Sequence, residues 1–247
     1  MIRLDQALVE RGLCDSREKA KRAILAGQVR INNQPARKAS DAIKSEDSIS
    51  LEAPEKFVSR GGHKLEHALL HFKLAVTGLT AIDLGASTGG FTDCLLQHGT
   101  AKVFAVDVGQ GQLAWKLRQE KRVVVMEKTN ARHLKLDQMP KTFSPADLAV
   151  IDCSFISLKK ILPTAVALLK TDGKIVALVK PQFEAGKTEV DKGRGVISDP
   201  AIHERVLQEL KEFVAAQNNL VWRSVTESPL LGPAGNKEFL VLIEKTS

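Results

Sequence analysis

The chain has 247 residues, and its 36 Lys or Arg against 29 Asp or Glu give a net charge of +7. At roughly 150 residues per domain this length predicts two domains, and the positive charge favours a polyanionic partner such as nucleic acid. No stretch reaches the ~18 apolar residues that span a bilayer, and no apolar signal core follows Met1, so we expect a soluble, cytoplasmic protein without a membrane partner.

The cysteines and histidines indicate no metal site. Cys14, Cys94 and Cys153 are far apart and form no C-x-x-C pair, so neither a disulfide framework nor a zinc site is predicted, and a reduced, intracellular setting fits. Three of the histidines repeat every four residues over residues 63–71. We interpret them as solvated or RNA-facing side chains and expect no bound metal.

The first forty residues have the pattern of two short helices followed by a strand. Apolar residues at helical spacing form the first helix, and Asp15 with Glu18 indicates a capping box that opens a second helix, closed by Gly27. Residues 29–31 alternate apolar and polar side chains, which predicts a strand before a turn at residues 33–35.

This segment also carries most of the positive charge, with nine Lys or Arg against four Asp or Glu in residues 1–40. Arg17 and Lys21 lie four apart on the second helix, a like-charge pair that costs roughly 0.2–0.5 kcal/mol unless an anion lies between them. The stretch RLDQALVERGLCDSREKAKRAILAGQVRINNQ resembles the S-four-type RNA-binding domain. The second helix and the following strand of that domain face RNA, so the resemblance implies RNA contact by these two elements. The expected RNA-binding residues are Arg3, Arg17, Lys21, Arg22, Arg30 and Arg60.

Residues 41–60 are charged and mixed, with Pro54 in the middle, and we interpret them as the last strand of this module and a linker. We therefore place a small α+β RNA-binding domain and its linker at residues 1–58 and a second domain at residues 59–247. The second domain opens on SRGGHKLEHAL, where a Gly-Gly turn precedes an amphipathic helix with Lys64 near its start.

From residue 79 onward, short apolar runs rich in Val and Ile alternate with helical patterns. Such runs suit strands buried on both faces of a parallel sheet. Helices are predicted over residues 158–169 and after Pro200, and the last two runs are expected to pair as an antiparallel hairpin at the sheet edge. The fold class is therefore α/β, a seven-strand doubly wound Rossmann-like domain. The predicted strands are residues 81–84, 103–106, 123–126, 148–151, 175–179, 220–225 and 239–243.

Ligands of such sheets bind beyond the carboxyl ends of the strands. After the first strand, the glycines of DLGASTGGFTDCLL let a ligand approach the backbone, and the following helix points its positive end at the turn. Asp107, after the second strand, suits hydrogen bonds from ribose hydroxyls. S-adenosylmethionine has a carboxylate and a ribose but no phosphate, so we expect it as the cofactor. The expected cofactor-binding residues are Asp83, Gly85, Ser87, Gly89, Gly90, Phe91, Asp107, Asn130, Ala131 and Asp152.

Two lysines and two carboxylates lie where they can meet beside this ligand. Lys180 follows the fifth strand, Lys64 follows its Gly-Gly turn, and Asp152 and Glu238 are placed to pair with them. A lysine acts as a base near neutrality when burial and a neighbouring cation lower its pKa. The carboxylates would orient the two amines beside the sulfonium, so the pattern indicates methyl transfer to a nucleophile that a lysine deprotonates.

Five ordered motifs, SRGGHKL, DLGASTGGFTDCLL, DCSFISL, LVKPQFE and GPAGNKEFLV, together resemble the TlyA (haemolysin A-like) family within the FtsJ-like group of ribose methyltransferases. The resemblance covers nearly the whole chain and implies 2′-O-methylation of a cytidine in ribosomal RNA, with ribosomal RNA or ribosomal subunits as partners. It implies a catalytic tetrad of Lys64, Asp152, Lys180 and Glu238, with Lys180 as the base. We favour a monomer.

Two positions depart from the wider pattern. Thr88 stands where the broader FtsJ-like group has proline, and Ala234 stands where many relatives carry a basic residue, so an RNA contact at Ala234 is not expected.

Three other functions are weighed against this one. DCSF loosely resembles the motif of amine methyltransferases that act on bases, but Cys153 and Ser154 supply no proline pair. A non-catalytic ribosome-binding factor would keep the donor pocket without the reaction. A pore-forming toxin is the least favoured, because no segment spans a membrane. Residues 184–198 are either a loop that closes on RNA or a surface excursion, and the sequence does not decide between them.

Overall fold

The structure of the protein, a computed structural model, describes residues 1–52 and 55–247. The chain forms two compact units, an N-terminal unit of Met1–Lys56 and a C-terminal unit of Phe57–Ser247. The second unit begins at Phe57 because this side chain is buried in its core and the next backbone N–H, at Val58, donates to Asp93 Oδ2. Pro54, which the sequence places in a linker, lies outside the described residues.

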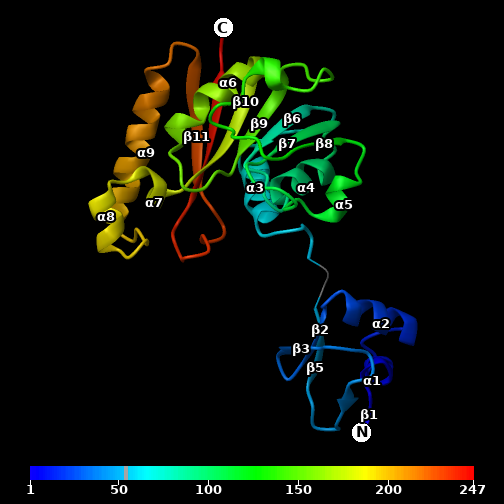
Figure 1. The fold of residues 1–247 in the computed structure, drawn as a ribbon. Coiled ribbons are helices and arrows are strands. Elements are labelled where there is room, and N and C mark those ends of the chain that lie inside the picture. The colour runs from blue at the N-terminus through cyan, green and yellow to red at the C-terminus, as the bar shows by residue number, and fades with distance from the viewer. Residues whose placement is uncertain (53–54) are drawn as a thin grey trace. The chain divides into compact units, whose positions relative to one another are not determined.

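In the N-terminal unit two helices pack against short antiparallel strands (Figure 1). Leu4 and Leu8 of the first helix and Ile24 of the second are buried together with Val29 and Ile43 from the strands. β3, β2 and β5 form one sheet in that order, and β1 pairs with β4. The elements are β1 (Ile2–Arg3), α1 (Leu4–Glu10), α2 (Arg17–Leu25), β2 (Val29–Ile31), β3 (Gln34–Pro35), β4 (Ala42–Ile43) and β5 (Ile49–Leu51).

Two local predictions in this unit are wrong. The N-cap of α2 is Ser16, whose hydroxyl accepts a hydrogen bond from the backbone N–H of Lys19, while Asp15 pairs with the Lys19 ammonium. Ser16 caps the helix because it directly precedes the first helical residue, Arg17, whereas Asp15 lies one residue farther out. The turn between β2 and β3 lies at Asn32 and Asn33, both with positive φ, because asparagine tolerates the left-handed conformation that a two-residue hairpin turn requires.

Arg3 and Arg17, both expected to bind RNA, hold the fully buried carboxylate of Asp5. Arg3 Nε donates to Oδ1 at 3.0 Å and Arg17 Nη2 donates to Oδ2 at 2.7 Å. Although burial favours the protonated acid, the hydrogen bonds from the two guanidiniums lower the pKa of Asp5 from 3.8 to about 2. The two arginines therefore stabilise their own unit, and only their remaining N–H groups are left for another partner.

Replacing Asp5 by alanine is expected to destabilise the N-terminal unit by about 1–3 kcal/mol at pH 7, because hydrogen bonds to a charged group are lost. A carboxylate with a depressed folded pKa stabilises the fold above its unfolded pKa, and the stabilisation is lost as the pH falls through the folded value. The difference from wild type should therefore close as the pH falls from about 4 to about 2. The NMR signals of the α1 and α2 amides during urea unfolding of the full chain measure the free energy of unfolding of this unit in each variant. Asp15→Ala, which removes an exposed pair, is the control, and an equal loss in both variants contradicts the prediction.

The C-terminal unit is built on one seven-stranded sheet in the order β11-β12-β10-β9-β6-β7-β8 (Figure 1). Neighbouring strands from β10 to β8 are parallel, while β12 runs antiparallel to both β10 and β11. The predicted α/β class and the hairpin at the sheet edge are confirmed. The strands are β6 (Thr80–Leu84), β7 (Lys102–Val106), β8 (Val123–Met126), β9 (Ala146–Ile151), β10 (Leu169–Val179), β11 (Leu220–Glu227) and β12 (Phe239–Lys245).

Helices cover both faces of this sheet, which explains why its strands are apolar on both sides. Leu65 of α3 and Leu95 of α4 pack on one face, and Ala165 of α6 and Leu210 of α9 pack on the other. Within the described ranges no helix is both long and apolar enough to cross a bilayer. The helices are α3 (Gly61–His71), α4 (Gly90–Gln97), α5 (Trp115–Arg118), α6 (Leu162–Leu168), α7 (Pro181–Glu184), α8 (Lys187–Lys192) and α9 (Pro200–Ala215), with 3₁₀ turns η1 (Leu136–Gln138) and η2 (Leu158–Lys160).

The helix predicted over residues 158–169 is shorter than its apolar stripe. It consists of η2 and then α6, which begins at Leu162. Pro163 lies in the first turn of α6, where a backbone N–H would have no acceptor within the helix, so its absence costs nothing. A helix that ran from Leu158 would place this proline in its interior, where a hydrogen bond would be lost. At the other end, Leu169 already belongs to β10.

Candidate active site

Three adjoining cavities open where the parallel strands end, and each is named here by one of its residues. The Asp107 cavity, the Lys64 cavity and the Phe155 cavity have volumes of about 460, 430 and 940 Å³. Ser154 lines all three, so they adjoin one another at the loop that follows β9. Volumes of this size are those of small-molecule sites, about 300–1,000 Å³.

Most of the predicted cofactor-binding residues line two of these cavities. Asp83 and Gly89 line none of the three. The Asp107 cavity is lined by Gly85, Ser87, Asp107, Asn130, Ala131 and Asp152. The Lys64 cavity is lined by Gly85, Ser87, Gly90, Phe91 and Asp152.

The glycines of the turn between β6 and α4 are required by the packing of the protein itself. Gly85 and Gly89 have φ of 91° and 95°, in the left-handed region that favours glycine. A Cβ added at Gly85 would lie 2.7 Å from the backbone carbonyl oxygen of Asp152, and one at Gly90 would overlap the Ser59 hydroxyl. Close approach of a ligand was the reason expected from the sequence. The structure adds a second reason, that the β9 loop and the start of α3 press against this turn.

Asp107 orders the same turn from the next strand. Its Oδ2 accepts from the backbone N–H of Ser87 and its Oδ1 accepts from that of Gly109, both at 2.7 Å. Each carboxylate oxygen can accept a further hydrogen bond, so Asp107 can hold the turn and still bind a ligand hydroxyl. The side chain thus fixes the boundary of the Asp107 cavity.

Asp83 lies beneath the turn instead of in a cavity. It is fully buried, and its Oδ2 accepts from the Thr92 hydroxyl at 2.7 Å. Burial raises the pKa of Asp83 to about 7, with the charge of Asp152 as a further cause. Its position supports the start of α4 and gives it no direct access to a ligand in the described cavities.

Lys180, at the end of β10, is held by the loop after β9. Its Nζ lies 2.6 Å from Asp152 Oδ1, an ion pair, and donates a hydrogen bond to Ser154 Oγ at 2.9 Å. Lys180 is only 9% exposed. β9 and β10 are parallel neighbours, so the residues that follow them emerge side by side at one sheet edge.

Lys64 and Glu238 form a second, more deeply buried pair. Lys64 Nζ donates to Glu238 Oε2, and the two residues are 6% and 1% exposed. Glu238 Oε1 is buried and, among the residues that the structure describes, has no hydrogen-bond partner. Glu238 directly precedes β12, whose antiparallel direction brings its amino end to the edge where β10 ends.

All four predicted catalytic residues therefore meet. Lys64, Asp152, Lys180 and Glu238 line the Lys64 cavity together, although they come from four separate segments. Two cations, each paired with a carboxylate, face one space beside the glycine turn. This is an arrangement that can both bind an anionic or polar group and accept a proton.

The predicted RNA-binding residues are less uniform. Lys21 pairs with Glu18 and Arg30 with Glu52, both on the surface of the N-terminal unit. Such exposed pairs contribute little and exchange easily for a phosphate. The exposed Arg22 lies on the same helix as Lys21, and Arg60, in the C-terminal unit, lines the Lys64 cavity.

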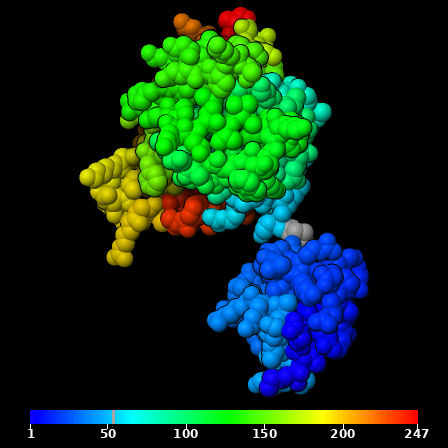
Figure 2. Space-filling view, turned by 45° about the vertical axis from the view of Figure 1, so that its right-hand side comes forward, coloured from blue at the N-terminus to red at the C-terminus, as the bar shows by residue number. Residues whose placement is uncertain are grey.

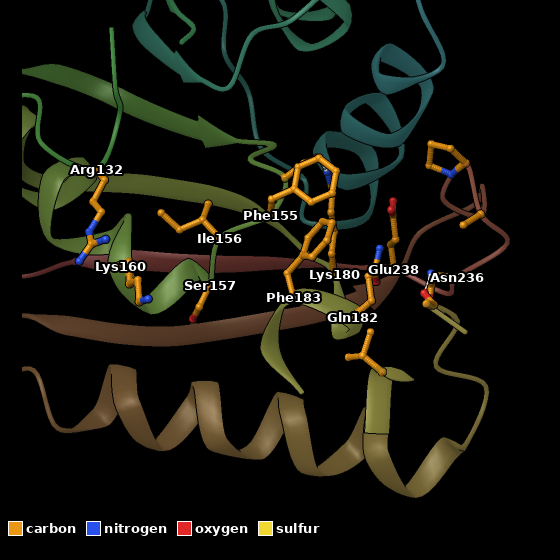
Figure 3. Close-up of a pocket in the computed structure, with 15 residues that line it drawn as sticks. Arg132, Phe155, Ile156, Ser157, Lys160, Lys180, Gln182, Phe183, Asn236 and Glu238 are labelled. Carbon is orange, nitrogen blue, oxygen red and sulfur yellow. Dashed lines mark hydrogen bonds between the residues drawn. The ribbon is translucent and has the colours of Figure 1, made fainter. Parts of the chain in front are cut away.

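Sequence reasoning missed an aromatic pair at the Phe155 cavity. Phe155 is 90% exposed with a φ of 62°, and its ring centroid lies 5.1 Å from that of Phe183. Figure 3 shows the two rings between Arg132 and Lys160 on one side and Glu238 on the other. Exposed rings beside cations suit a nucleobase. The signal was present in DCSFISL, where a phenylalanine follows the strand-end Asp152 by three residues.

Two other sequence features acquire definite places. His67 hydrogen-bonds the Thr226 hydroxyl and stacks on His71, and no group of metal-binding side chains occurs in residues 1–52 and 55–247.

The segment over residues 184–198 contains α8 and projects from the C-terminal unit in Figure 2, in yellow. Asn236 fastens its end, because the side chain binds the Gly195 carbonyl and the Ile197 N–H.

A doubly wound sheet with a ligand cavity at its first glycine turn and paired lysines beside it defines a Rossmann-like group-transfer enzyme. Residues 57–245 match the FtsJ-like methyltransferase family, and residues 2–49 match the S4 domain. The chain belongs to the FtsJ-like methyltransferase family, and its methyl donor is S-adenosylmethionine.

Relatives match along nearly the full chain. The proposed rRNA methyltransferase YqxC of Bacillus subtilis is 48% identical over 97% of this chain and 84% of its own. The 16S/23S rRNA (cytidine-2′-O)-methyltransferase TlyA of Mycobacterium tuberculosis is 46% identical over 97% and 88% of the two chains. The solved structure of a proposed hemolysin from Streptococcus thermophilus is 42% identical, covers 99% of this chain and 88% of that chain, and has a TM-score of 0.75.

Proposed function

We propose that this protein transfers the methyl group of S-adenosylmethionine to the 2′-hydroxyl of a cytidine in ribosomal RNA. One observation carries the proposal, the meeting of Lys64, Asp152, Lys180 and Glu238 in a cavity that adjoins the Asp107 cavity. A ribose hydroxyl becomes a nucleophile when a base removes its proton, and amines held by carboxylates can do this. The printed name of the M. tuberculosis relative agrees with this substrate.

The Asp107 cavity suits the nucleoside part of the donor and the Lys64 cavity suits its reacting end. Asp107 offers acceptors for ribose hydroxyls, and Asn130 and Ala131 line the same cavity. Gly90 and Phe91, at the start of α4, line the Lys64 cavity, where a helix N-terminus favours a carboxylate. When bound, S-adenosylmethionine supplies a methyl group on a positively charged sulfur, and that charge favours the neutral form of a nearby amine.

Lys180 is the proposed base. Asp152 and Ser154 hold its Nζ beside the Lys64 cavity, which Lys180 lines, and there it accepts the proton of the 2′-hydroxyl as the oxygen bonds to the methyl carbon. Lys64, fixed by Glu238, lines the same cavity as a second amine beside the reacting groups. The carboxylates therefore orient the amines and do not themselves react.

The N-terminal unit and the rims of the cavities supply the proposed RNA contacts. Lys21, Arg22 and Arg30 offer cations for phosphates, which position RNA without reading its sequence. At the site, Arg60 lines the Lys64 cavity and Phe155 offers a face on which a target base can stack. Because ribosomal RNA is the proposed substrate, we expect the protein to act in the cytoplasm. We also expect it to act as a monomer.

Alkaline digestion tests the position of the methyl group. Ribosomal subunits from cells lacking this gene are incubated with the protein and labelled S-adenosylmethionine, and the RNA is then digested with alkali. Cleavage requires a free 2′-hydroxyl, so the label should remain in an uncut dinucleotide with cytidine on its 5′ side. Label released in mononucleotides indicates methylation of a base and overturns the proposal.

The structure gives no support to a thiol nucleophile for base methylation. Burial raises the pKa of the Cys153 thiol to about 12, with the charge of Asp152 as a second cause. Only a thiolate is an effective nucleophile, so this cysteine stays unreactive near neutrality. The paired lysines therefore remain the groups that the proposed reaction uses.

A further inference from the structure

Ser154 occupies a position that the proposed reaction does not yet use. It follows Asp152 by two residues in the loop after β9, and it lines all three cavities. Its hydroxyl oxygen accepts a hydrogen bond from Lys180 Nζ at 2.9 Å. The side chain thus contacts the proposed base at the point where the spaces for donor and RNA meet.

The surroundings of Lys180 make this contact significant. An amine nitrogen has four tetrahedral positions, of which one is the bond to its own side chain. Among the residues that the structure describes, Ser154 takes a second position through its hydrogen bond, and Asp152 lies beside the nitrogen as an ion-pair partner at 2.6 Å without a hydrogen bond to it. In the neutral amine, one hydrogen is then directed at Ser154. The lone pair can face the substrate when the second hydrogen is on the side of Asp152.

The loop that carries Ser154 is fastened to the segment that carries Lys180. Glu184, in α7 just after Lys180, accepts hydrogen bonds from the Ser157 hydroxyl and the Leu158 N–H, both at 2.6 Å. Just before these anchors, Phe155 has a φ of 62°, a left-handed conformation that costs a non-glycine residue about 1–3 kcal/mol. Strain of this kind persists only where the surroundings fix the backbone, so the position of the Ser154 hydroxyl is well determined.

We propose that Ser154 is a positioning residue that, together with Asp152, turns the lone pair of Lys180 toward the ribose 2′-hydroxyl. This inference rests on the proposed function. In the methyl-transfer step, the O–H bond of the ribose 2′-hydroxyl breaks, and its proton forms an N–H bond on Lys180. The oxygen electron pair forms the bond to the methyl carbon, and the pair of the carbon–sulfur bond stays on sulfur.

Ser154→Ala is expected to lower kcat about tenfold or more, the size of one lost hydrogen bond to a charged group. The KM for RNA and the Kd for S-adenosylmethionine should stay within about twofold of wild type, because the amine is turned away but remains in the cavity. Ser154→Thr keeps the hydroxyl and should restore most of kcat. Ser154→Cys has nearly the shape of serine but a weak acceptor, and it should behave like Ser154→Ala.

Steady-state rates at varied concentrations of ribosomal subunits and saturating donor measure kcat and the KM for RNA, and calorimetric titration measures donor binding. Ser198→Ala, at an exposed serine that lines none of the three cavities, is the control. Wild-type kcat in both Ser154→Ala and Ser154→Cys overturns the inference, as does a Ser154→Thr protein that is as slow as they are. Equal losses of kcat and donor affinity also overturn it. A wild-type protein that leaves no alkali-resistant dinucleotide refutes the proposed function instead.

Discussion

Replacing Lys180 by methionine is expected to slow methyl transfer by about 10²–10⁴-fold, the contribution of a positioned general base. Methionine nearly fills the same volume, so Asp152 and Ser154 lose their cation while the cavity keeps its shape. Binding of S-adenosylmethionine should change little, because Lys180 does not line the Asp107 cavity, where we place the nucleoside. Labelled methyl transfer to ribosomal subunits and calorimetric titration of the donor measure the two effects.

Lys211→Met is the matched control, because it makes the same substitution at an exposed position of α9. It should transfer methyl groups at the wild-type rate. If Lys180→Met does so too, Lys180 is not the base. If Lys180→Met and wild type are both inactive while both bind donor and RNA, the protein is a binding factor and not an enzyme.

Replacing Glu238 by alanine is expected to destabilise the C-terminal unit by about 3–5 kcal/mol. Lys64 would lose its partner in a site where it is only 6% exposed. The loss of a carboxylate from the surface has no such effect, so Glu204→Ala, at an exposed position of α9, is the control. Trp115 and Trp222 both belong to the C-terminal unit, so their fluorescence during urea unfolding reports on this unit.

A double variant separates the stability of the pair from its role in the reaction. Lys64→Met together with Glu238→Leu removes both charges and fills the space with apolar side chains, which restores most of the stability in comparable buried pairs. The double variant should therefore unfold near the wild-type urea concentration and still fail to transfer methyl groups. An active double variant would show that the pair serves stability alone.

The sequence predicted the fold because the strands of this sheet are buried on both faces. Residues 103–106 and 148–151 had to be apolar throughout, and such runs stand out from the charged segments around them. The ends of α6 were harder to predict, because Leu158, Leu162 and Leu169 are at helical spacing although only Leu162 belongs to the helix. Leu158 lies in η2, before Pro163, and Leu169 already belongs to β10. Burial on one face produced the spacing, and the missing N–H of Pro163 decided the backbone.

The candidate site was predictable where topology alone places a residue. Asp107, Asp152 and Lys180 follow parallel strands, and the carboxyl ends of such strands share one edge. Ser154 was not predictable as a site residue, because the loop that carries it is fastened by hydrogen bonds from Ser157 and Leu158 to Glu184, in a different segment. The spacing of residues along the chain does not show which distant side chains form such hydrogen bonds.

The place of β12 in the sheet has a consequence for folding. β11 precedes β12 in the chain, yet β12 lies between β10 and β11, so β11 has no strand to pair with until β12 is in place. β11 therefore joins the sheet only through β12, and the β10–β12 contacts, which have a long sequence separation, form slowly. A chain cut before Phe239 would lose two strands from its sheet, and a hydrophobic edge on β10 would be left open to aggregation.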